Sequence, residues 1–526
     1  MNDTSLPNRV VIIGAGFAGL ATAALLARAG VDVTVVEQND GVGGRSGEIE
    51  ADGFRWDTGP SWYLMPDAFD HFFQLLGTTT AQQLELVDLD PGYRIFPEGQ
   101  PAVDVPTGRD NAIAFFESVE PGAGQKLADY LDSARDAYDI AVDRFLYTTF
   151  SSLGPLVHKD VRQRIRPLTS LLTTPLDTFV GTKFQSTLLR QILEYPAVFL
   201  SSRPEKTPAM YHLMSHTDLV QGVSYPQGGF MAVAQAIYRL ANENGARFVF
   251  NTSVTAITTE GTHATGVRVR TSDGVVDTIA ADVVISCADL HHTETHLLPE
   301  KLRSYPESSF AHKDPGIGTV LVLLGVSGKL PQLRHHNLFF SEDWRDDFDV
   351  VFSGPTPNRL LDSSHSIYVS MPSATDPAVA PKDHENLFVL IPTPAQENFG
   401  HGDAYRDSAS ARVTNIANQA IDQISRWADI PDLAERIVVR KTLGPSDFSE
   451  RYNAWRGGSI GPAHTLRQSA FLRGSNKSKK VAGLYYAGAT TVPGVGVPMC
   501  LISAENIVKR LRSDSSPGPL SPDWVS

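Results

Sequence analysis

Two stretches of the chain, one near each end, share the hydrophobic pattern of a buried strand, a glycine-rich loop and a helix. Near the N-terminus the almost continuous apolar run RVVIIGAG predicts a strand buried on both faces of a parallel sheet, and LATAALLARAG predicts the following helix. VDVTVVE then predicts a second strand. Near the C-terminus GLYYAGATTVPGVGVPMCLISAENIVKRL, residues 483–511, repeats the order of strand, loop and helix. Since such a unit presents backbone N–H groups to phosphate, both ends are predicted to contact one phosphate-containing ligand.

The middle of the chain alternates between helical and strand-like patterns. Residues 111–222 have a mixed polar and apolar periodicity typical of helices, whereas 225–257 restores a turn, a helix and a strand. Residues 267–288 predict a hairpin that ends in an apolar strand. Residues 299–450 combine further apolar strands with a helix near 405–428.

These patterns predict an α/β fold with a Rossmann-type cofactor-binding domain whose parallel sheet is discontinuous in sequence. A substrate domain with a mixed sheet and a helical region for substrate or membrane contact complete the prediction. The predicted division is a first cofactor-binding segment, 1–110; a helical region, 111–222; a second cofactor-binding segment, 223–298; a substrate domain, 299–450; a third cofactor-binding segment, 451–512; and a disordered Ser/Pro-rich tail, 513–526.

Charge and cysteine content narrow the class of protein. The chain has 45 Lys and Arg against 59 Asp and Glu, a net charge of −14, and no long basic run, so nucleic acid is not expected as a partner. Its two cysteines, Cys287 and Cys500, lie far apart and belong to no disulfide framework or zinc motif. The first ten residues lack a signal-peptide pattern, and the longest apolar stretch, 316–326, is too short to cross a bilayer. We therefore expect a cytoplasmic protein without a transmembrane segment.

The N-terminal loop has the GxGxxG spacing of dinucleotide-binding proteins. Gly14, Gly16 and Gly19 follow the first predicted strand and open the helix, with Phe17 and Ala18 between them. Gly14 permits a tight turn, Gly16 lets a pyrophosphate approach the backbone, and Gly19 lets the helix and the strand pack closely. The context of strand, loop, helix and second strand makes this motif far more specific than the spacing alone.

Two further features indicate which dinucleotide the site binds. Glu37, at the end of the second predicted strand, can accept hydrogen bonds from an adenosine ribose and would repel the 2′-phosphate of NADP. Just downstream, GVGGRSG places Gly43 and Gly44 in a second loop over the pyrophosphate and supplies a cation, Arg45. NAD dehydrogenases do not need this second clamp, whereas it recurs in a large flavoprotein superfamily. The pattern therefore predicts FAD as the cofactor.

The C-terminal unit is explained by the length of FAD, whose flavin ring must be held beyond the dinucleotide-binding sheet. Gly488 would let the chain pass the pyrophosphate and the ribityl group. The PGVGVP loop and the start of the next helix would direct N–H groups at the O2 edge of the flavin, where reduction adds negative charge. Both ends of the chain are thus predicted to bind a single FAD.

Three stretches carry a resemblance to a known family: VVIIGAGFAGLATAALLARAGVDVTVVEQNDGVGGRSG, YPQGGF, and GGSIGPAHTLRQSAFLRGSNKSKKVAGLYYAGATTVPGVGVPMCLISAE. With them the chain resembles bacterial phytoene desaturases, the carotenoid-desaturase family within the wider group of monoamine oxidases and protoporphyrinogen oxidases. The match runs in order along nearly the whole chain and is diffuse only in residues 110–220. The resemblance implies backbone contacts to the cofactor at Gly488, Thr490, Gly494 and Val497, and a backbone contact to adenine at Val254.

The same resemblance implies FAD-dependent desaturation of phytoene, usually to lycopene, with the flavin removing a hydride. The substrate would be a long apolar polyene taken from the inner face of the cell membrane, and electrons would pass to oxygen or a quinone. Three alternatives stay open: another carotenoid desaturase or oxidase, a flavin amine or porphyrinogen oxidase, and a non-enzymatic prenyl- or lipid-binding protein of the same fold. An apolar tunnel would favour a polyene, and the intact FAD motifs argue against the non-enzymatic alternative.

No catalytic residue is identifiable from the sequence, in keeping with chemistry that the flavin itself supplies. Arg55 and Asp57 in FRWDTGP could lie near the cavity, but a structural ion pair is at least as good an interpretation. Asp160 is a candidate acid or base by its rough position in the family. The histidines at 291–292 and 335–336 have no further ligands at metal-binding spacing, so we interpret them as surface or capping residues and predict no metal site.

Overall fold

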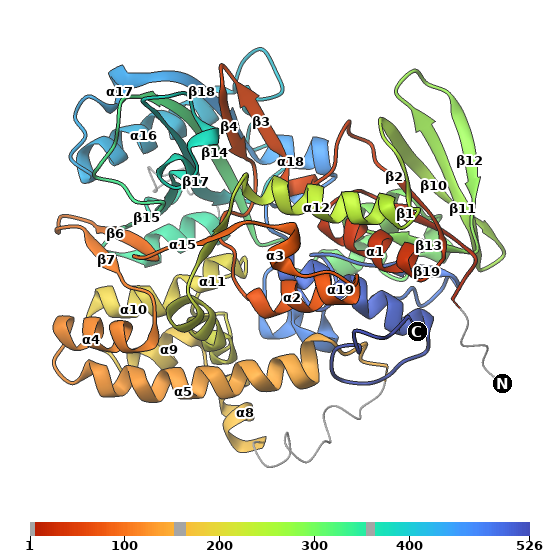
Figure 1. Cartoon of the computed structure of the whole chain (residues 1–526), viewed down its shortest axis with the longest axis horizontal. Helices are drawn as coiled ribbons and strands as arrows, with labels where there is room; N and C mark the ends of the chain where they lie inside the picture. Colours follow the sequence, from red (N-terminus) through yellow and green to blue (C-terminus); the bar gives the residue numbers. More distant parts are fainter. Residues whose placement is uncertain (1–5, 152–164, 354–362, 526) are drawn as a thin grey trace.

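A parallel sheet near one end of the molecule is built from distant segments of the chain. The structure is a computed structural model that describes residues 6–151, 165–353 and 363–525 (Figure 1). Five parallel strands form this sheet in the order β19-β13-β1-β2-β9. Their bounds are Arg9–Ile13 for β1, Asp32–Val36 for β2, Arg247–Val249 for β9, Val283–Ser286 for β13 and Leu484–Tyr486 for β19. The prediction of a Rossmann-type sheet that is discontinuous in sequence is confirmed.

Both faces of this sheet are buried, which explains the continuous apolar run of β1. Val10 and Ile12 point into one hydrophobic core, and Val11 and Ile13 belong to a second core on the opposite face. The covering elements are α1 (Phe17–Arg28), α12 (Gly229–Glu243) and α19 (Val497–Leu511) on the first face, and a three-stranded sheet of β10 (Thr252–Glu260), β11 (His263–Thr271) and β12 (Val276–Ala280) on the second. α1 packs against both α12 and α19 (Figure 1).

A second sheet, of seven strands, forms the other half of the molecule. Its order is β18-β14-β17-β16-β15-β6-β7, with β6 parallel to β15 and the other neighbours antiparallel. The strands are β6 (Tyr93–Pro97), β7 (Val103–Val105), β14 (Ile317–Ser327), β15 (His336–Phe340), β16 (Ile367–Ser370), β17 (His384–Pro394) and β18 (Ile437–Leu443). The sequence placed β6 and β7 in the first cofactor-binding segment, but they extend this mixed sheet, because β6 pairs with a strand more than 230 residues away.

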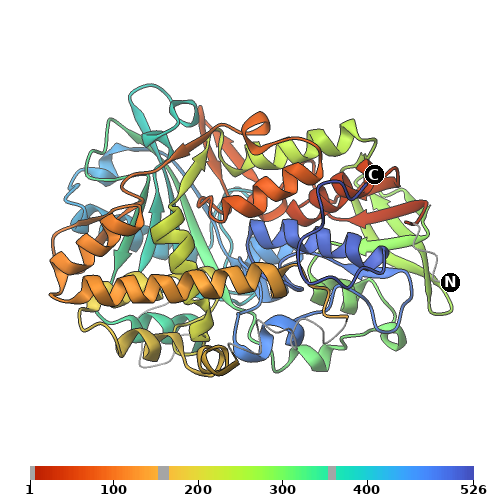
Figure 2. The ribbon, with the colours of Figure 1, turned by 60° about the horizontal axis from the view of Figure 1, so that its bottom comes forward.

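The second sheet separates two further cores. Val320 and Val322 of β14 face α16 (Ala411–Trp427), whereas Leu321 and Leu323 face the helical region. The described helices of that region are α4 (Arg109–Val119), α5 (Ala123–Ala141), α8 (Ile165–Thr173), α9 (Leu176–Gly181), α10 (Thr187–Glu194) and α11 (Pro196–Phe199). Figure 2 shows α5, in orange, extending along the molecule toward α19, in blue.

Short elements join these layers. The remaining helices are α2 (Pro66–Leu75), α3 (Thr80–Gln83), α13 (Leu290–His296), α14 (Glu307–Phe310), α15 (Trp344–Ser353), α17 (Leu433–Arg436) and α18 (Pro445–Tyr452). Two small antiparallel pairs, β3 (Glu48–Ala51) with β4 (Phe54–Asp57) and β5 (Leu86–Asp88) with β8 (Ser224–Pro226), complete the described strands. α2 packs on α19 and so closes the first core from the side of the helical region.

The C-terminal tail differs from its predicted disorder. Residues 513–525 lie against the helices of the first core, and Trp524 is only 6% exposed. The indole Nε1 of Trp524 donates to the carbonyl of Leu75 at 3.2 Å, and the buried Lys509 donates to the carbonyl of Ser516 at 2.7 Å. Composition missed this arrangement because one buried tryptophan and one buried lysine hold a segment whose other residues are polar or proline.

Candidate functional site

A cavity of about 510 Å³ lies between the parallel sheet and the second sheet. Its lining includes Gly16 and Gly44 from the N-terminal motifs and Gly488 from the C-terminal loop. It also includes Thr319 and Leu390 from the second sheet. The volume is typical of small-molecule sites, and the two glycine-rich ends of the chain therefore border one space.

The N-terminal turn contains glycines with two different functions. Gly14 has φ +96° and donates its N–H to the carbonyl of Val36 at 2.8 Å. A Cβ on Gly19 would lie 1.9 Å from the carbonyl oxygen of Gly14, so Gly19 makes the close packing of loop and helix possible. A Cβ on Gly16 would meet nothing nearer than Gly44 Cα at 3.8 Å, so the side of Gly16 that lacks a side chain faces the second glycine loop and the cavity.

The first turn of α1 offers uncapped N–H groups to the cavity. Gly16 is the N-cap of α1 and supplies no side-chain cap, and the first turn contains no acidic residue. Phe17 and Ala18, which follow it, line the cavity with Gly16, whereas Gly19 does not. An uncapped helix N-terminus of this kind attracts an anion.

The second glycine loop crosses over the first and brings Arg45 to the cavity. Gly43 donates its N–H to the carbonyl of Ala15 at 3.0 Å, and a Cβ on Gly43 would lie 2.8 Å from the carbonyl oxygen of Ser46. Arg45 Nη1 donates to the carbonyl of Ile460 at 3.2 Å, and Nη2 lies 3.6 Å from an oxygen of Asp289. The buried Nε of Arg45 has no partner among the described residues, so one donor of this guanidinium is left for a ligand.

Glu37 lies at the predicted end of β2 and holds the loops around it. Its Oε2 accepts the backbone N–H of Ala15 at 2.7 Å, and its Oε1 accepts the backbone and side-chain N–H groups of Asn39 at 2.9 and 2.8 Å. The carboxylate is almost fully buried and lines the cavity, as does Val254 of β10. Glu37 therefore also has a structural function, which the sequence did not reveal.

The C-terminal loop meets the N-terminal motif directly. A Cβ on Gly488 would lie 3.3 Å from Ala18 Cβ, and Gly488 donates its N–H to Ser503 Oγ at 3.0 Å. Thr490 lines the cavity and its Oγ1 accepts the N–H of Leu290 at 3.1 Å.

The other two predicted residues of this loop lie on different sides of it. Val497 lines the cavity at the start of α19, whose N-cap Gly496 supplies no side-chain cap. Gly494 lies behind the cavity wall, where a Cβ would come within 2.3 Å of the His464 ring. Its lack of a side chain makes room for that histidine.

The rest of the cavity is apolar and faces one side of the second sheet. Leu321, Leu390 and Tyr368 are register partners on three adjacent strands and form a row in its wall. Trp62 and Phe199 line it from the helical side. The sequence indicated the helical region for substrate or membrane contact, and the structure adds this sheet face, whose register depends on pairings that no local pattern specifies.

The site fits a dinucleotide with a pyrophosphate. Glycine loops from both ends of the chain leave space at the cavity, two helices begin there without side-chain caps, and Arg45 keeps an unpaired donor.

The family model described as flavin containing amine oxidoreductase matches residues 17–512. A carotenoid 3,4-desaturase of Haloarcula japonica is 39% identical over 507 residues, which cover 96% of this chain and 98% of the relative. A zeta-carotene-forming phytoene desaturase of Myxococcus xanthus is 31% identical over 518 residues, which cover 98% and 95%.

The chain belongs to the carotenoid desaturases, within the flavin-containing amine oxidoreductase family. The predicted family and the predicted cofactor, FAD, are thereby confirmed. Putrescine oxidase bound to putrescine has a similar fold, with a TM-score of 0.59 at 15% identity over 96% of this chain and 99% of that chain.

The site of this desaturase predicts a measurable contribution of Glu37 to FAD binding. We expect Glu37→Ala to weaken FAD binding by roughly 1.5–3 kcal/mol, the range for hydrogen bonds to a charged acceptor. Glu37→Gln keeps one side-chain oxygen, so its FAD binding should be weakened less than that of Glu37→Ala. Titration of the apoprotein with FAD measures both, and equal affinity of wild type and Glu37→Ala would contradict the assignment.

The residues considered for proton transfer lie outside the cavity wall of the desaturase. Asp57 accepts the N–H groups of Phe230 and Met231 at 2.7 and 3.2 Å, so it caps the start of α12. Burial raises the pKa of Asp57 to about 7, and these two N–H groups oppose that rise. Arg55 forms an ion pair with Glu48 at 3.2 Å. Neither Asp57 nor Arg55 lines the cavity.

One further candidate acid or base, Asp160, lies outside the described residues.

One pair of histidines was placed wrongly by the sequence. His335 and His336 are buried, at 6% and 0% exposure, and are not surface residues. The His336 ring stacks on Trp62 at 4.5 Å, and its Nδ1 lies 2.7 Å from the Tyr368 hydroxyl. His291 instead pairs with Glu307 at 2.9 Å near the surface. Among the described residues no group of three or more His, Cys, Asp and Glu is placed to hold a metal.

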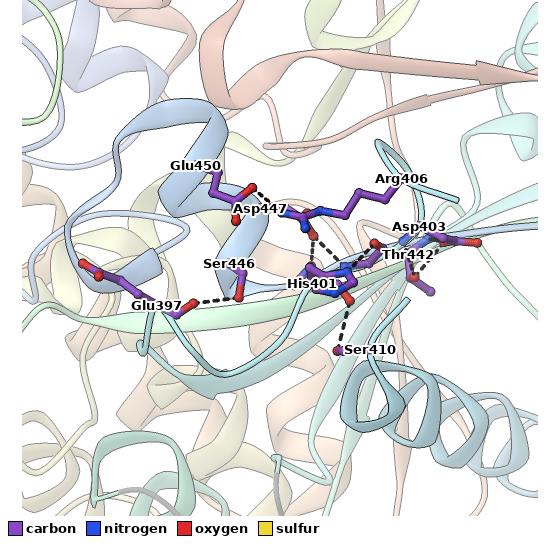
Figure 3. A network of polar contacts seen from close by, with 11 residues as sticks. Glu397, His401, Asp403, Arg406, Ser410, Thr442, Ser446, Asp447 and Glu450 are labelled. Carbon is purple, nitrogen blue, oxygen red and sulfur yellow. Dashed lines mark hydrogen bonds and ion pairs between the residues drawn. The ribbon is translucent and has the colours of Figure 1, made fainter. Parts of the chain in front are cut away.

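A polar network positions α18 at the end of the cavity that contains Glu37. Phe448 of α18 and Asn453 just after it line the cavity, and Asn453 donates to Gln38 at 3.1 Å. Asp447 of the same helix accepts the N–H groups of Gly402 and Gly444 at 2.7 and 2.8 Å. Figure 3 shows this network, which also contains Glu397, His401, Asp403, Arg406, Ser410, Thr442, Ser446 and Glu450. The sequence missed it because its members come from a loop, strand β18 and helix α18.

Proposed function

We propose that this protein uses FAD to desaturate an acyclic C40 carotenoid, with phytoene, converted toward lycopene, as one candidate substrate. The observation that carries the proposal is the continuity of the cavity. It joins the cradle formed by the glycine loops at Gly16, Gly44 and Gly488 to the apolar row of Leu321, Leu390 and Tyr368. A polyene has no polar group to pair, so an apolar wall beside the cofactor suits it.

The chain contributes orientation and exclusion of water to this chemistry. Each desaturation removes a hydride from one carbon and a proton from its neighbour, and bound FAD supplies the hydride acceptor. The side chains of Trp62, Phe199 and Phe388 would hold the polyene against the cofactor and keep water away from it. We propose that the electrons then pass to oxygen or to a membrane quinone.

A second candidate reaction is 3,4-desaturation of a carotenoid. The Haloarcula japonica relative with that activity in its name is 39% identical to this chain, against 31% for the Myxococcus xanthus phytoene desaturase. The identities therefore favour the second reaction, whereas the cavity suits both.

Expression in carotenoid-producing hosts separates the two reactions. One host accumulates phytoene and another accumulates lycopene, and pigments are separated by chromatography with absorption spectra. New conjugated double bonds formed from phytoene support the first reaction, and a longer conjugated chain formed only from lycopene supports the second. Unchanged pigments in both hosts, with FAD-loaded protein present in the cells, would contradict carotenoid desaturation.

We further propose that the protein takes its substrate from the inner face of the cell membrane as a peripheral protein. Among the described residues no helix is long and apolar enough to cross a bilayer. Leu466, Phe471 and Leu472 are large apolar side chains that are 46%, 62% and 50% exposed. They lie close to the cavity, because the Tyr211 hydroxyl, in the cavity wall, donates to Ser469 Oγ at 3.0 Å.

Liposome flotation tests the membrane proposal. We expect the protein to float with liposomes at low salt and in about 1 M salt, where the Debye length is about 3 Å and charge contacts are screened. Phe471→Glu combined with Leu472→Glu should abolish flotation. Val438→Glu, at an exposed apolar position in β18, is the matched control and should float. Equal flotation of all three proteins would refute docking through this loop.

A further inference from the structure

A buried arginine lies directly behind the C-terminal cofactor loop. Arg473 is 6% exposed, and every one of its side-chain nitrogens donates to a backbone carbonyl. The acceptors are Thr491 (3.1 Å), Gln468 (3.1 Å), Pro462 (3.2 Å) and Ala489 (2.6 Å). Four carbonyls accept four of its five N–H groups, but carbonyls carry no net charge, so a whole positive charge remains in the interior.

No acidic side chain neutralises this charge. In residues 6–151, 165–353 and 363–525 no carboxylate forms an ion pair with Arg473. The titratable groups that feel its charge are Tyr211, His464 and Lys313, none of which has a carboxyl group. Burial lowers the pKa of Arg473 to about 10, an effect that Tyr211 opposes, so the guanidinium stays charged at neutral pH.

The position of Arg473 connects its charge to the cofactor. Two of its acceptors, Ala489 and Thr491, belong to the loop that follows Gly488, and Ala489 lines the cavity. The loop meets the N-terminal glycine motif at Ala18, whose Cβ lies 3.3 Å from where a Cβ of Gly488 would be. With the adenosine at Glu37 and the pyrophosphate at the glycine loops, as proposed, the flavin ring would lie toward this loop.

His464 supports the same loop without adding charge. Its Nε2 accepts the N–H of Val495 at 3.2 Å, and its Nδ1 lies 2.7 Å from the Tyr211 hydroxyl. Because Nε2 is an acceptor here, the proton of the neutral ring is on Nδ1, which donates to the Tyr211 oxygen. Burial, with the charge of Arg473 in addition, holds the pKa of His464 well below its usual range. Arg473 is therefore the charged member of this support.

We propose that Arg473 is a positioning residue that raises the reduction potential of the bound FAD through its uncompensated charge. Accepting a hydride brings one additional negative charge into the cavity. A fixed positive charge in a water-poor interior stabilises that negative charge more than it would in water. Reduced FAD is then bound more tightly relative to oxidised FAD. The proposal rests on FAD as the cofactor and on no particular substrate.

The test is the midpoint potential of FAD in purified variants, measured by dye equilibration without any carotenoid. We expect Arg473→Met to weaken the binding of reduced relative to oxidised FAD at least tenfold, which is about 30 mV of lower potential for a two-electron couple. Arg473→Lys keeps the charge but loses hydrogen bonds, and its potential should stay close to that of wild type. Arg436→Met is the matched control, because Arg436 also donates to backbone carbonyls, those of Ser327 and Lys329, away from the cavity.

A second measurement keeps the proposal testable if Arg473→Met does not fold. A buried lysine loses its proton more readily than an exposed one, so the potential of Arg473→Lys should fall more steeply with rising pH than that of wild type between about pH 7 and 10. A potential of Arg473→Met equal to that of wild type would overturn the proposal. Two other results would assign Arg473 to loop packing alone. One is an equal decrease in the midpoint potential of Arg473→Met and Arg473→Lys, and the other is the same dependence of the potential on pH in Arg473→Lys and wild type.

Discussion

Gly16→Val is expected to abolish FAD binding while the apoprotein stays folded. The open side of Gly16 faces the second glycine loop across 3.8 Å and borders the cavity, and valine methyl groups would occupy the space predicted for the pyrophosphate. A loss of at least about 100-fold in affinity, ~2.8 kcal/mol, should appear in titration of the apoprotein with FAD. Circular dichroism and thermal unfolding of the apoprotein should match wild type.

Gly19→Ala is the matched control, because Gly19 belongs to the same motif but is required for the packing of the helix on the loop and not for space at the cavity. Its Cβ would lie 1.9 Å from the Gly14 carbonyl, so the methyl group strains the packing of α1 on the loop. We expect a lower free energy of unfolding, by about 1–3 kcal/mol, already without FAD. Wild-type FAD affinity in Gly16→Val, or the same unfolding loss in both variants, would contradict the assignment of the cradle.

Ala141→Trp is expected to stop carotenoid conversion without removing FAD. Ala141 lies at the end of α5 and lines the cavity on the helical side, where an indole would fill space that a polyene needs. A decrease of at least about tenfold in conversion, ~1.4 kcal/mol in the activation free energy, should accompany a normal flavin absorption spectrum. Product formation from liposomal carotenoid measures the conversion, and the absorption spectrum of the purified protein measures the bound flavin.

Arg135→Trp provides the control for Ala141→Trp. Arg135 lies on the exposed side of the same helix, with 71% of its side chain accessible, so an indole there meets solvent. Its conversion rate should stay close to that of wild type. Undiminished conversion by Ala141→Trp would place the substrate elsewhere, and loss of flavin from Ala141→Trp would show that the substitution disturbs the cradle instead.

The sequence was most informative where one local pattern determines one structural feature. The unbroken apolar run of β1 predicted a strand buried on both faces, and Val10 and Val11 indeed enter two different cores. The glycine spacings predicted two loops at one cavity, and Gly14 and Gly43 have the positive φ angles that such turns require. A local backbone requirement, such as a positive φ angle, restricts the residue type at that position and can therefore be predicted from the sequence.

The features that the sequence missed depend on long-range packing. β6 pairs with β15, His336 stacks on Trp62, and Trp524 is buried. The local sequence around these residues predicts none of these contacts. Asp57 was compatible with either acid–base chemistry or an ion pair, and only the fold shows that it caps α12. Arg473 lies in a stretch that carries the family resemblance, and the sequence alone does not show that no carboxylate among the described residues forms an ion pair with it.

The most direct test of carotenoid desaturation is reduction of the bound FAD by the polyene itself. The FAD-loaded protein is mixed without oxygen with liposomes that contain phytoene or lycopene, and the absorbance of oxidised flavin is followed together with that of the carotenoid. We expect the flavin absorbance to fall in step with the appearance of a longer conjugated polyene, in one of the two liposome samples or in both. Flavin that stays oxidised with both carotenoids but is reduced by an amine or a porphyrinogen would contradict the account.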